Sequence, residues 1–423
     1  MERTHQQRSA LLLVALTILI DFIGFGLILP LLPFWAQRLG ANPFQIGLIM
    51  TAYALAQFIF TPVLGTLSDR CGRRPVILVS LVIEAIALAL TALAWTFPLL
   101  LLARFVGGLG ASNIGSAQAV VSDTTPPEQR ARGMGLIGAA IGVGFVVGPA
   151  LGGILSHIEP GLPFWVAAGV ALINALLVFI LLPETRCPDA AVEGTAARRR
   201  DFLLSGWSTL WRYPVIGRLV AINLLFTLAF TSMETALPLL VQRNFGWTAT
   251  QSGYIFAYVG VLIVIMQGGL IGQLVKHWRE QTIFIGGLLL LALGLLLLTV
   301  SNQVSVLLVA LGVLSVGDGA VTPLASTLLS FASPPDVQGE ILGTAQGVGG
   351  LGRIAGPLLA GSFFAFAGPT TPFLMGGILG MLAVLLALPA MQITRRPRPE
   401  TASERSGNIA VNRTETIPQT HQQ

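Results

Sequence analysis

The amino-acid sequence predicts an all-α membrane protein with twelve transmembrane helices, arranged as two six-helix halves in parallel orientation. Three observations lead to this fold class. Only 10% of the 423 residues are charged and the mean hydropathy is +0.78, whereas ordinary soluble domains carry about 25% charged residues. Apolar runs long enough to cross a bilayer recur along the whole chain. A segment that begins near residue 126 returns, without a gap, near residue 334.

The twelve helices follow from the breaks between apolar segments, because a span needs about 20 mostly apolar residues. The first run exceeds the apolar region of a signal peptide and contains Asp21, so we expect an uncleaved first helix. The predicted spans are 10–36, 45–67, 76–95, 97–122, 130–157, 162–183, 215–241, 249–275, 281–300, 303–331, 339–367 and 371–391.

Orientation follows from the basic residues. If the N-terminus lies inside, only Arg38 and Arg243 of the 24 Lys and Arg residues fall in outer loops, and Arg104 and Arg353 fall within spans. This is a strong positive-inside asymmetry. It places both termini in the cytoplasm and explains the net charge of +5 without a nucleic-acid partner.

The repeat defines the domains. "PPEQRARGMGLIGAAIGVGFVVGPALGG" at 126 and "PPDVQGEILGTAQGVGGLGRIAGPLLAG" at 334 share their Pro-Pro pair and five glycine or Gly-Pro positions; "GTLSDR" at 65–70 is echoed by "GQLVKH" at 272–277. Parallel repeats are one of the known plans of transporters, with the substrate site between them. We expect a six-helix bundle at 1–183, a cytoplasmic linker at 184–214, a second bundle at 215–391 and a disordered cytoplasmic tail at 392–423.

Other classes of protein find no support. Cys71 and Cys187 form neither a disulfide framework nor a metal cluster, and the four histidines lack zinc spacing. The chain has no phosphate-binding G-x-x-x-x-G-K-[ST] motif, so ATP is not expected to drive it. We expect no enzyme activity, no metal and no cofactor.

Two motifs carry a resemblance to a known family. "GTLSDRCGRRP" from Gly65 resembles the loop between helices 2 and 3 of the major facilitator superfamily, and the likeness covers nearly the whole chain. "GVGFVVGPALGG" in helix 5 resembles the signature of proton-coupled efflux antiporters, through Gly142, Gly148, Pro149, Gly152 and Gly153. Small residues let helices approach closely, Pro149 is expected to kink the helix, and the family likeness implies a seal against proton leak.

The chain is most similar to the twelve-span drug:proton antiporters, tetracycline-type efflux proteins among them. "LIDFIGFGLILPLLP" and "LLARFVGGLGASNIG" resemble their first and fourth helices. Helix 9 lacks the acid of tetracycline exporters, helix 8 lacks their histidine near Ile263, and Glu84 lies three residues before the position of their helix-3 acid. These differences argue against tetracycline itself and not against efflux.

The resemblance implies a conformational latch at the cytoplasmic face. Asp69 is expected to face the N-terminus of helix 11 near Gly339, where a carboxylate is stabilised by about 0.3–1 kcal/mol. Arg73 is expected to pair with Asp123 by a charge-assisted bond. Gly65 and Gly72 would permit a tight turn. Arg70 and Arg74 complete the set, although any single arginine here could serve only as a topological anchor.

Charges inside spans cost about 2.5–3.5 kcal/mol on insertion scales and therefore need a reason. Asp21 lies about 16 Å into helix 1 at 1.5 Å per residue. It is our preferred proton carrier and Glu84 is the alternative, with Arg104 as the opposing cation. A static ion pair with Arg104 would explain either acid without any transport role.

The second half supplies the candidates for substrate contact. Glu234 is expected to bind a cationic substrate and Asp318 to assist it, unless Arg353 neutralises them; the glycines beside Asp318 could instead mark a helix break. Mixed aromatic and amide walls suit flat amphipathic compounds. The further cavity candidates are Phe25, Tyr53, Gln57, Asn113, Gln118, Asn223, Tyr254, Tyr258 and Gln346.

The sequence therefore predicts a proton-coupled efflux antiporter of the bacterial inner membrane. It would export amphipathic drug-like or metabolite molecules by alternating access, driven by the proton gradient. We expect a monomer, the family default, surrounded by the lipid bilayer. A sugar or carboxylate importer or facilitator of the same fold is the first alternative, and a non-transporting receptor or scaffold is the second.

Overall fold

The computed structural model describes residues 2–124, 130–184, 212–334 and 337–389, and the described residues fold into helices joined by short connections. Eleven of these helices are long and apolar enough to cross a membrane, and Thr371–Ala387 is a shorter apolar twelfth. Most of the predicted linker and nearly all of the predicted tail lie outside the described residues.

The first group contains six spans. Its elements are α1 (Glu2–Ile28), α2 (Leu32–Arg38), α3 (Pro43–Cys71), α4 (Arg73–Ala92), α5 (Phe97–Gly110), η1 (Ala111–Asn113), α6 (Ile114–Thr124), α7 (Arg130–Ile158) and α8 (Leu162–Leu181). The segment α5–η1–α6 forms the fourth span. The side chains of Asn42 and Gln45 form a reciprocal capping box that starts α3, which satisfies two free backbone donors.

The second group repeats this order. Its elements are α10 (Pro214–Phe245), α11 (Ala249–Ile265), the π-turn η3 (Met266–Leu270), α12 (Ile271–His277), α13 (Glu280–Leu298), α14 (Val304–Ala332), α15 (Gln338–Phe366) and α16 (Thr371–Ala387). A second capping box, from Thr248 and Gln251, starts α11. The segment α11–η3–α12 forms one span.

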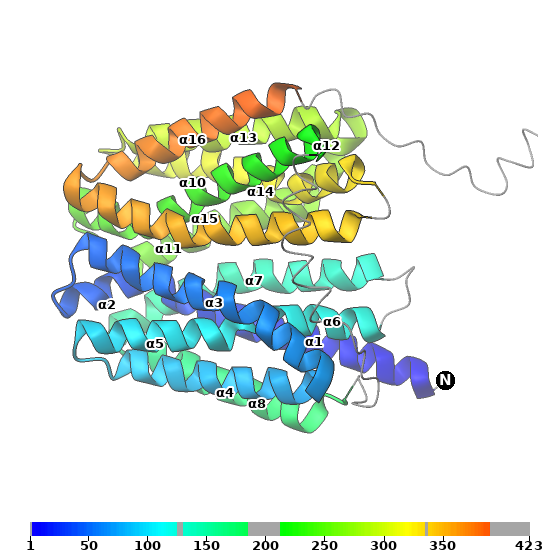
Figure 1. Ribbon diagram of the computed structural model, residues 1–423. Coiled ribbons are helices and arrows are strands. Elements are labelled where there is room, and N and C mark those ends of the chain that lie inside the picture. The colour runs from blue at the N-terminus through cyan, green and yellow to red at the C-terminus, as the bar shows by residue number, and fades with distance from the viewer. Residues whose placement is uncertain (1, 125–129, 185–211, 335–336, 390–423) are drawn as a thin grey trace, which may run out of the picture.

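The two groups lie side by side, and most helices pack within their own group (Figure 1). Helix α7 packs along α1, and α15 packs along α10 in the same way. Between the groups, α7 contacts α11 and α3 contacts α15. We call these two contacts the α7–α11 seam and the α3–α15 seam.

The repeated glycines divide between these packing surfaces in the same manner in both groups. A Cβ on Gly148 would lie 2.8 Å from the Cα of Gly26 in α1, and one on Gly356 would lie 2.9 Å from the Leu228 oxygen in α10. A Cβ on Gly153 would lie 2.8 Å from the Thr250 oxygen across the α7–α11 seam. One on Gly361 would lie 2.5 Å from the Pro43 oxygen across the α3–α15 seam. Equivalent glycines therefore pack on equivalent helices in the two groups.

Both seams begin near one end of the bundle, at Gly253 of α11 and Gly47 of α3, and continue along the helices. A Cβ on Gly142 of α7 would still lie 3.1 Å from Val264 of α11, and one on Gly350 of α15 would lie 2.8 Å from Phe58 of α3. At the opposite end, which carries the loop around Gly72, an ideal Cβ on Gly135, Gly138 or Gly339 would meet no atom within 4 Å. At these three glycines the described residues therefore leave the helix surface uncovered.

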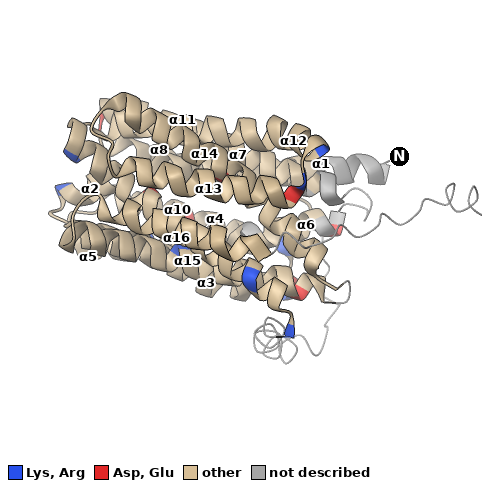
Figure 2. Ribbon diagram, turned by 90° about the horizontal axis from the view of Figure 1, so that it is seen from above, with Lys and Arg blue, Asp and Glu red and all other residues tan. Residues whose placement is uncertain are grey.

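Charged residues gather at the ends of the bundle, with a few in its interior (Figure 2). Two local expectations are corrected by the helices. Gly65 lies inside α3 and not in a turn, because that helix continues to Cys71; Gly72, with a φ of 100°, forms the turn. Helix α14 runs unbroken past Asp318. Pro149 lies inside the continuous helix α7, and the expected kink there stays a prediction.

Candidate functional site

A half-buried carboxyl group lies within the first group. Asp21 of α1 accepts two hydrogen bonds from amides: Asn174 Nδ2 of α8 lies 2.7 Å from Oδ1, and Asn113 Nδ2 of η1 lies 3.2 Å from Oδ2. Asn174 also donates to the backbone oxygen of Thr17 at 3.0 Å. Both oxygens of this carboxyl are therefore held by neutral donors.

A second acid and an arginine lie in the same region. Glu84 of α4 and Arg104 of α5 are 7% and 4% exposed. The Arg104 guanidinium lies 4.3 Å from the ring centroid of Tyr53, a cation–π contact. Glu84 Oε2 and Arg104 Nε are buried without a hydrogen-bond partner among the described residues. The salt bridges of the described chain include neither acid, so the static ion pair with Arg104 is not formed in this state.

Glycines of α5 bring these groups together. A Cβ on Gly108 would lie 2.2 Å from the backbone oxygen of Tyr53, and one on Gly110 would lie 2.7 Å from the backbone nitrogen of Glu84. Only a residue without a side chain lets α3 and α4 approach α5 this closely. The "RFVGGLG" segment thus supplies both the cation and the surfaces that seat its neighbours.

The second group holds another set of charges in its spans. Asp318 of α14 is 7% exposed and accepts a long bond of 3.4 Å from Thr322 Oγ1. Glu234 of α10 is half-buried and lies within electrostatic range of Asp318 and Arg353. Arg353 of α15 is exposed, and the described salt bridges do not include it. Full neutralisation of these acids by Arg353 does not occur in this arrangement.

The other cavity candidates separate by environment. Phe25 packs on Tyr53 and Phe145, with ring centroids 5.7 and 5.8 Å apart. Three side chains bind backbone oxygens between neighbouring elements: Gln57 to Ala111, Asn223 to Ala345 and Tyr258 to Leu308. Exposed side chains are found at Gln118, Tyr254 and Gln346. Asn113 belongs to the Asp21 site.

The loop between α3 and α4 centres on Arg73, which is 5% exposed. Its guanidinium lies 2.7 Å from Asp69 and 3.1 Å from Asp123, and donates to Ser68 Oγ at 2.7 Å. The expected pair of Arg73 and Asp123 is thus present. A Cβ on Gly339 would meet no atom within 4 Å, and the expected approach of Asp69 to this position stays a prediction.

Three residues near these sites were not anticipated. Asn174 is an uncharged residue in an apolar helix, and only the packing of α8 on α1 reveals its partner. Glu184, just after α8, accepts from the backbone N–H groups of Arg73 and Arg74 at 2.8 and 3.2 Å and so caps α4. Glu280, just before the expected ninth span, starts α13 and is 6% exposed. A buried carboxylate beside a helix start could have been sought in the sequence.

Taken together, the fold and the site define a multi-pass membrane transporter built from two related bundles, with buried acids in its spans. Residues 14–286 and 270–418 match the model of the Major Facilitator Superfamily. The chain belongs to this superfamily, whose members are secondary transporters and not enzymes.

Several known proteins are similar over nearly the whole length. The class H tetracycline resistance protein of Pasteurella multocida is 31% identical over 90% of this chain and 94% of its own. Major facilitator superfamily domain-containing protein 10 of Mus musculus is 28% identical over 91% of this chain and 93% of its own. The crystal structure of the human organic anion transporter MFSD10 superposes with a TM-score of 0.68 at 28% identity, covering 90% of this chain and 99% of that one.

Proposed function

We propose that the chain is a proton-coupled efflux antiporter that exports amphipathic drug-like or metabolite molecules by alternating access. One observation carries the proposal: Asp21 and Glu84 are carboxyl groups held within spans with no described cation within 4.0 Å. An intramembrane acid is costly unless it serves a function such as a proton relay. Asp21 is the proton carrier, and Glu84 with Arg104 sets its electrostatic surroundings.

The arrangement of the two groups supports alternating access. If both termini and the Gly72 loop lie on the cytoplasmic side of a bacterial inner membrane, as the charge asymmetry favours, the two seams would seal the outer side and the inner side would be open. The latch, formed by Asp69, Arg73 and Asp123, would close the inner side when Asp69 meets the start of α15 near Gly339. The glycines of the helix-5 motif lie on the packing surfaces of α7 and let neighbouring helices approach closely. Close packing along the α7–α11 seam would prevent proton leak there.

The substrate would bind between the bundles, which we assign to residues 1–183 and 215–391. Glu234 and Asp318 outnumber Arg353 in the second bundle, which favours a substrate with a cationic group. One similar protein is named for tetracycline resistance and another is titled an organic anion transporter. The exposed guanidinium of Arg353 could meet an anionic group, so both charge classes belong in the test. We expect one monomer to transport.

The test uses inside-out vesicles that hold an acidic interior and a pH-sensitive dye. Ethidium serves as the amphipathic cation and fluorescein as the amphipathic anion, and vesicles with Asp21→Asn run in parallel. Antiport predicts that at least one probe enters wild-type vesicles and dissipates the gradient, whereas the variant leaves the gradient intact. Entry of a probe without proton movement would contradict coupling and would favour a facilitator.

A further inference from the structure

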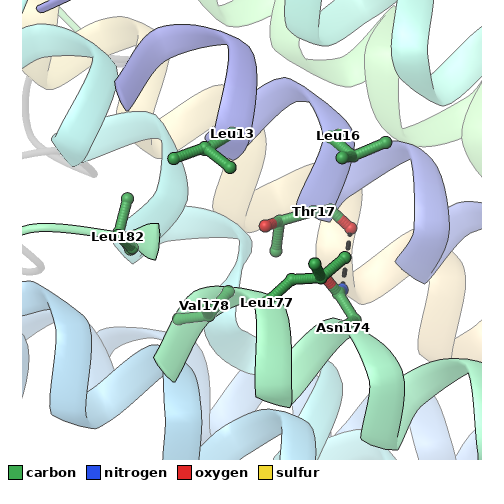
Figure 3. A pocket seen from close by; sticks show the side chains of 7 residues that line it. All are labelled: Leu13, Leu16, Thr17, Asn174, Leu177, Val178 and Leu182. Carbon is green, nitrogen blue, oxygen red and sulfur yellow. Dashed lines mark hydrogen bonds between the residues drawn. The ribbon is translucent and has the colours of Figure 1, made fainter. Parts of the chain in front are cut away.

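The amide of Asn174 occupies an unusual position for a buried polar group. Asn174 is 0% exposed in α8 and, with Thr17, lies among apolar side chains of α1, of α8 and of the residue that follows α8: Leu13, Leu16, Leu177, Val178 and Leu182 (Figure 3). Its Nδ2 makes two hydrogen bonds, to Asp21 and to the Thr17 backbone oxygen. Its Oδ1 is buried without a partner.

The unpaired, buried Oδ1 of Asn174 lowers the stability of the folded protein. A buried polar atom without a partner costs about 1–3 kcal/mol, whereas an apolar side chain of the same shape at such a site is close to neutral. The Thr17 oxygen belongs to the interior of α1, where helical bonding does not depend on Asn174. Packing alone would therefore favour leucine at position 174. The bond to Asp21 is what distinguishes asparagine.

Other groups do not replace the amides. Helix α1 packs mainly on α6, α7 and α8. Beyond these helices, Glu84 of α4 and Tyr53 of α3 interact electrostatically with Asp21. Arg104 of α5 lies over the Tyr53 ring. Helix α7 brings glycines and Phe145 against this region of α1. The hydrogen bonds that the structure gives to the Asp21 carboxyl are those of Asn174 and Asn113.

We propose that Asn174 is a positioning residue of the proton site: with Asn113 it clamps both oxygens of Asp21 and stabilises the carboxylate with neutral donors in place of a cation. The proposal rests on the proposed function, in which Asp21 carries the proton. When the carboxylate takes up a proton, its new O–H becomes a donor. A rotation of the Asn174 amide then presents Oδ1 as the acceptor, so one residue can serve both protonation states.

Infrared spectroscopy of the purified, lipid-reconstituted protein tests the clamp without any substrate. The carboxylic C=O band that disappears in Asp21→Asn is followed from pH 4 to pH 10. In Asn174→Leu we expect its titration midpoint to move about one pH unit higher, because bonds to charged groups are roughly twice as strong as neutral ones. In Asn113→Leu, which removes the longer bond, we expect a smaller shift in the same direction.

The matched control is Trp35→Phe. It removes one bond between α2 and α4, from Trp35 Nε1 to the Thr91 oxygen at 3.0 Å, away from any carboxyl of the proton site. We expect it to lower the melting temperature and to leave the Asp21 midpoint unchanged. Asn174→Leu is expected to show the reverse, an unchanged or higher melting temperature with a shifted midpoint.

An Asn174→Leu midpoint equal to that of the wild type would overturn the proposal, as would an Asp21 band that does not titrate in this range. A lower melting temperature of Asn174→Leu without a shift of the Asp21 midpoint would mean that Asn174 acts only through packing. Failure of antiport in the vesicle assay leaves these spectra interpretable, so the two proposals fail separately.

Discussion

Deep in their described spans, the two bundles each carry two acids and one arginine, and the acids are buried to a similar degree. In the first bundle Asp21 is clamped by two amides, and Arg104 is 4% exposed. In the second, Asp318 accepts one long bond from Thr322, and Arg353 is exposed. A repeated backbone therefore does not repeat its chemistry. A clamped acid near an enclosed arginine suits a proton, whereas loosely bonded acids near an accessible arginine suit a larger partner, and this is the division of roles that we propose.

Replacing one acid in each bundle is the strongest way to break this comparison. Asp21→Asn should lower gradient-driven efflux by about 100-fold, since proton-transferring groups typically contribute this much or more, while substrate exchange at equal pH survives. Asp318→Asn should instead weaken probe binding and leave the number of protons per substrate unchanged. Both quantities come from paired flux and pH measurements in proteoliposomes. Equal losses of coupling in the two variants would erase the division of roles.

The latch tests the comparison at the end that we propose to be open. Asp69→Asn removes the charge proposed to meet the start of α15, and about 0.3–1 kcal/mol corresponds to about a two- to fivefold change in a state population. We expect turnover to fall by about this factor with near-normal expression, measured as efflux per molecule of protein in the membrane. Normal turnover would contradict the latch. Gln273→Ala, an exposed change on α12 of the other bundle, is the control.

Substitutions in the corresponding loops of the two bundles should also differ in their effect on protein stability. Arg73→Ala leaves Asp69 and Asp123 without their shared cation, and both acids are about one-third exposed, which screens them. We expect a loss of about 2 kcal/mol in the free energy of unfolding, of which the buried Ser68 contact is part. Lys276→Ala changes an exposed side chain and should cost at most about 0.5 kcal/mol. Denaturant unfolding in detergent compares them, and similar losses would mean that Arg73 has no special place.

Two glycines of α7 separate packing within a bundle from packing between bundles. Gly148→Ala forces a Cβ against α1 and should lower stability by about 1–3 kcal/mol in every state. Gly153→Ala forces a Cβ against α11 only while the α7–α11 seam is closed. It should therefore shift the population toward the state with that seam open, read out by thiol labelling of a cysteine placed near the seam. Unchanged labelling with reduced stability would show that the seam does not open.

The spans could be predicted well because hydropathy depends on composition alone. The intramembrane charges could also be predicted, because charged residues are conspicuous within apolar segments. Contacts between helices were harder. Asn174 could not be matched with Asp21 without the rotation of α8 about its axis. Glu184 lies in a polar stretch where nothing marks it as the cap of α4. Gly65 was misplaced because a helix can extend past the apolar segment, and α3 continues through "GTLSDRC".

The π-turn in the eighth span records a difference in length between the bundles. The capping residues Asn42 and Gln45 correspond to Thr248 and Gln251, 206 residues later, whereas Gly65 corresponds to Gly272, 207 residues later. The second bundle thus contains one additional residue in this span, and Met266–Leu270 lies within that interval. A π-turn takes up one extra residue without breaking the helix. Removal of Gly268, whose Cβ position is open, should therefore leave a continuous α-helix, and the shortened protein should still fold and reach the membrane.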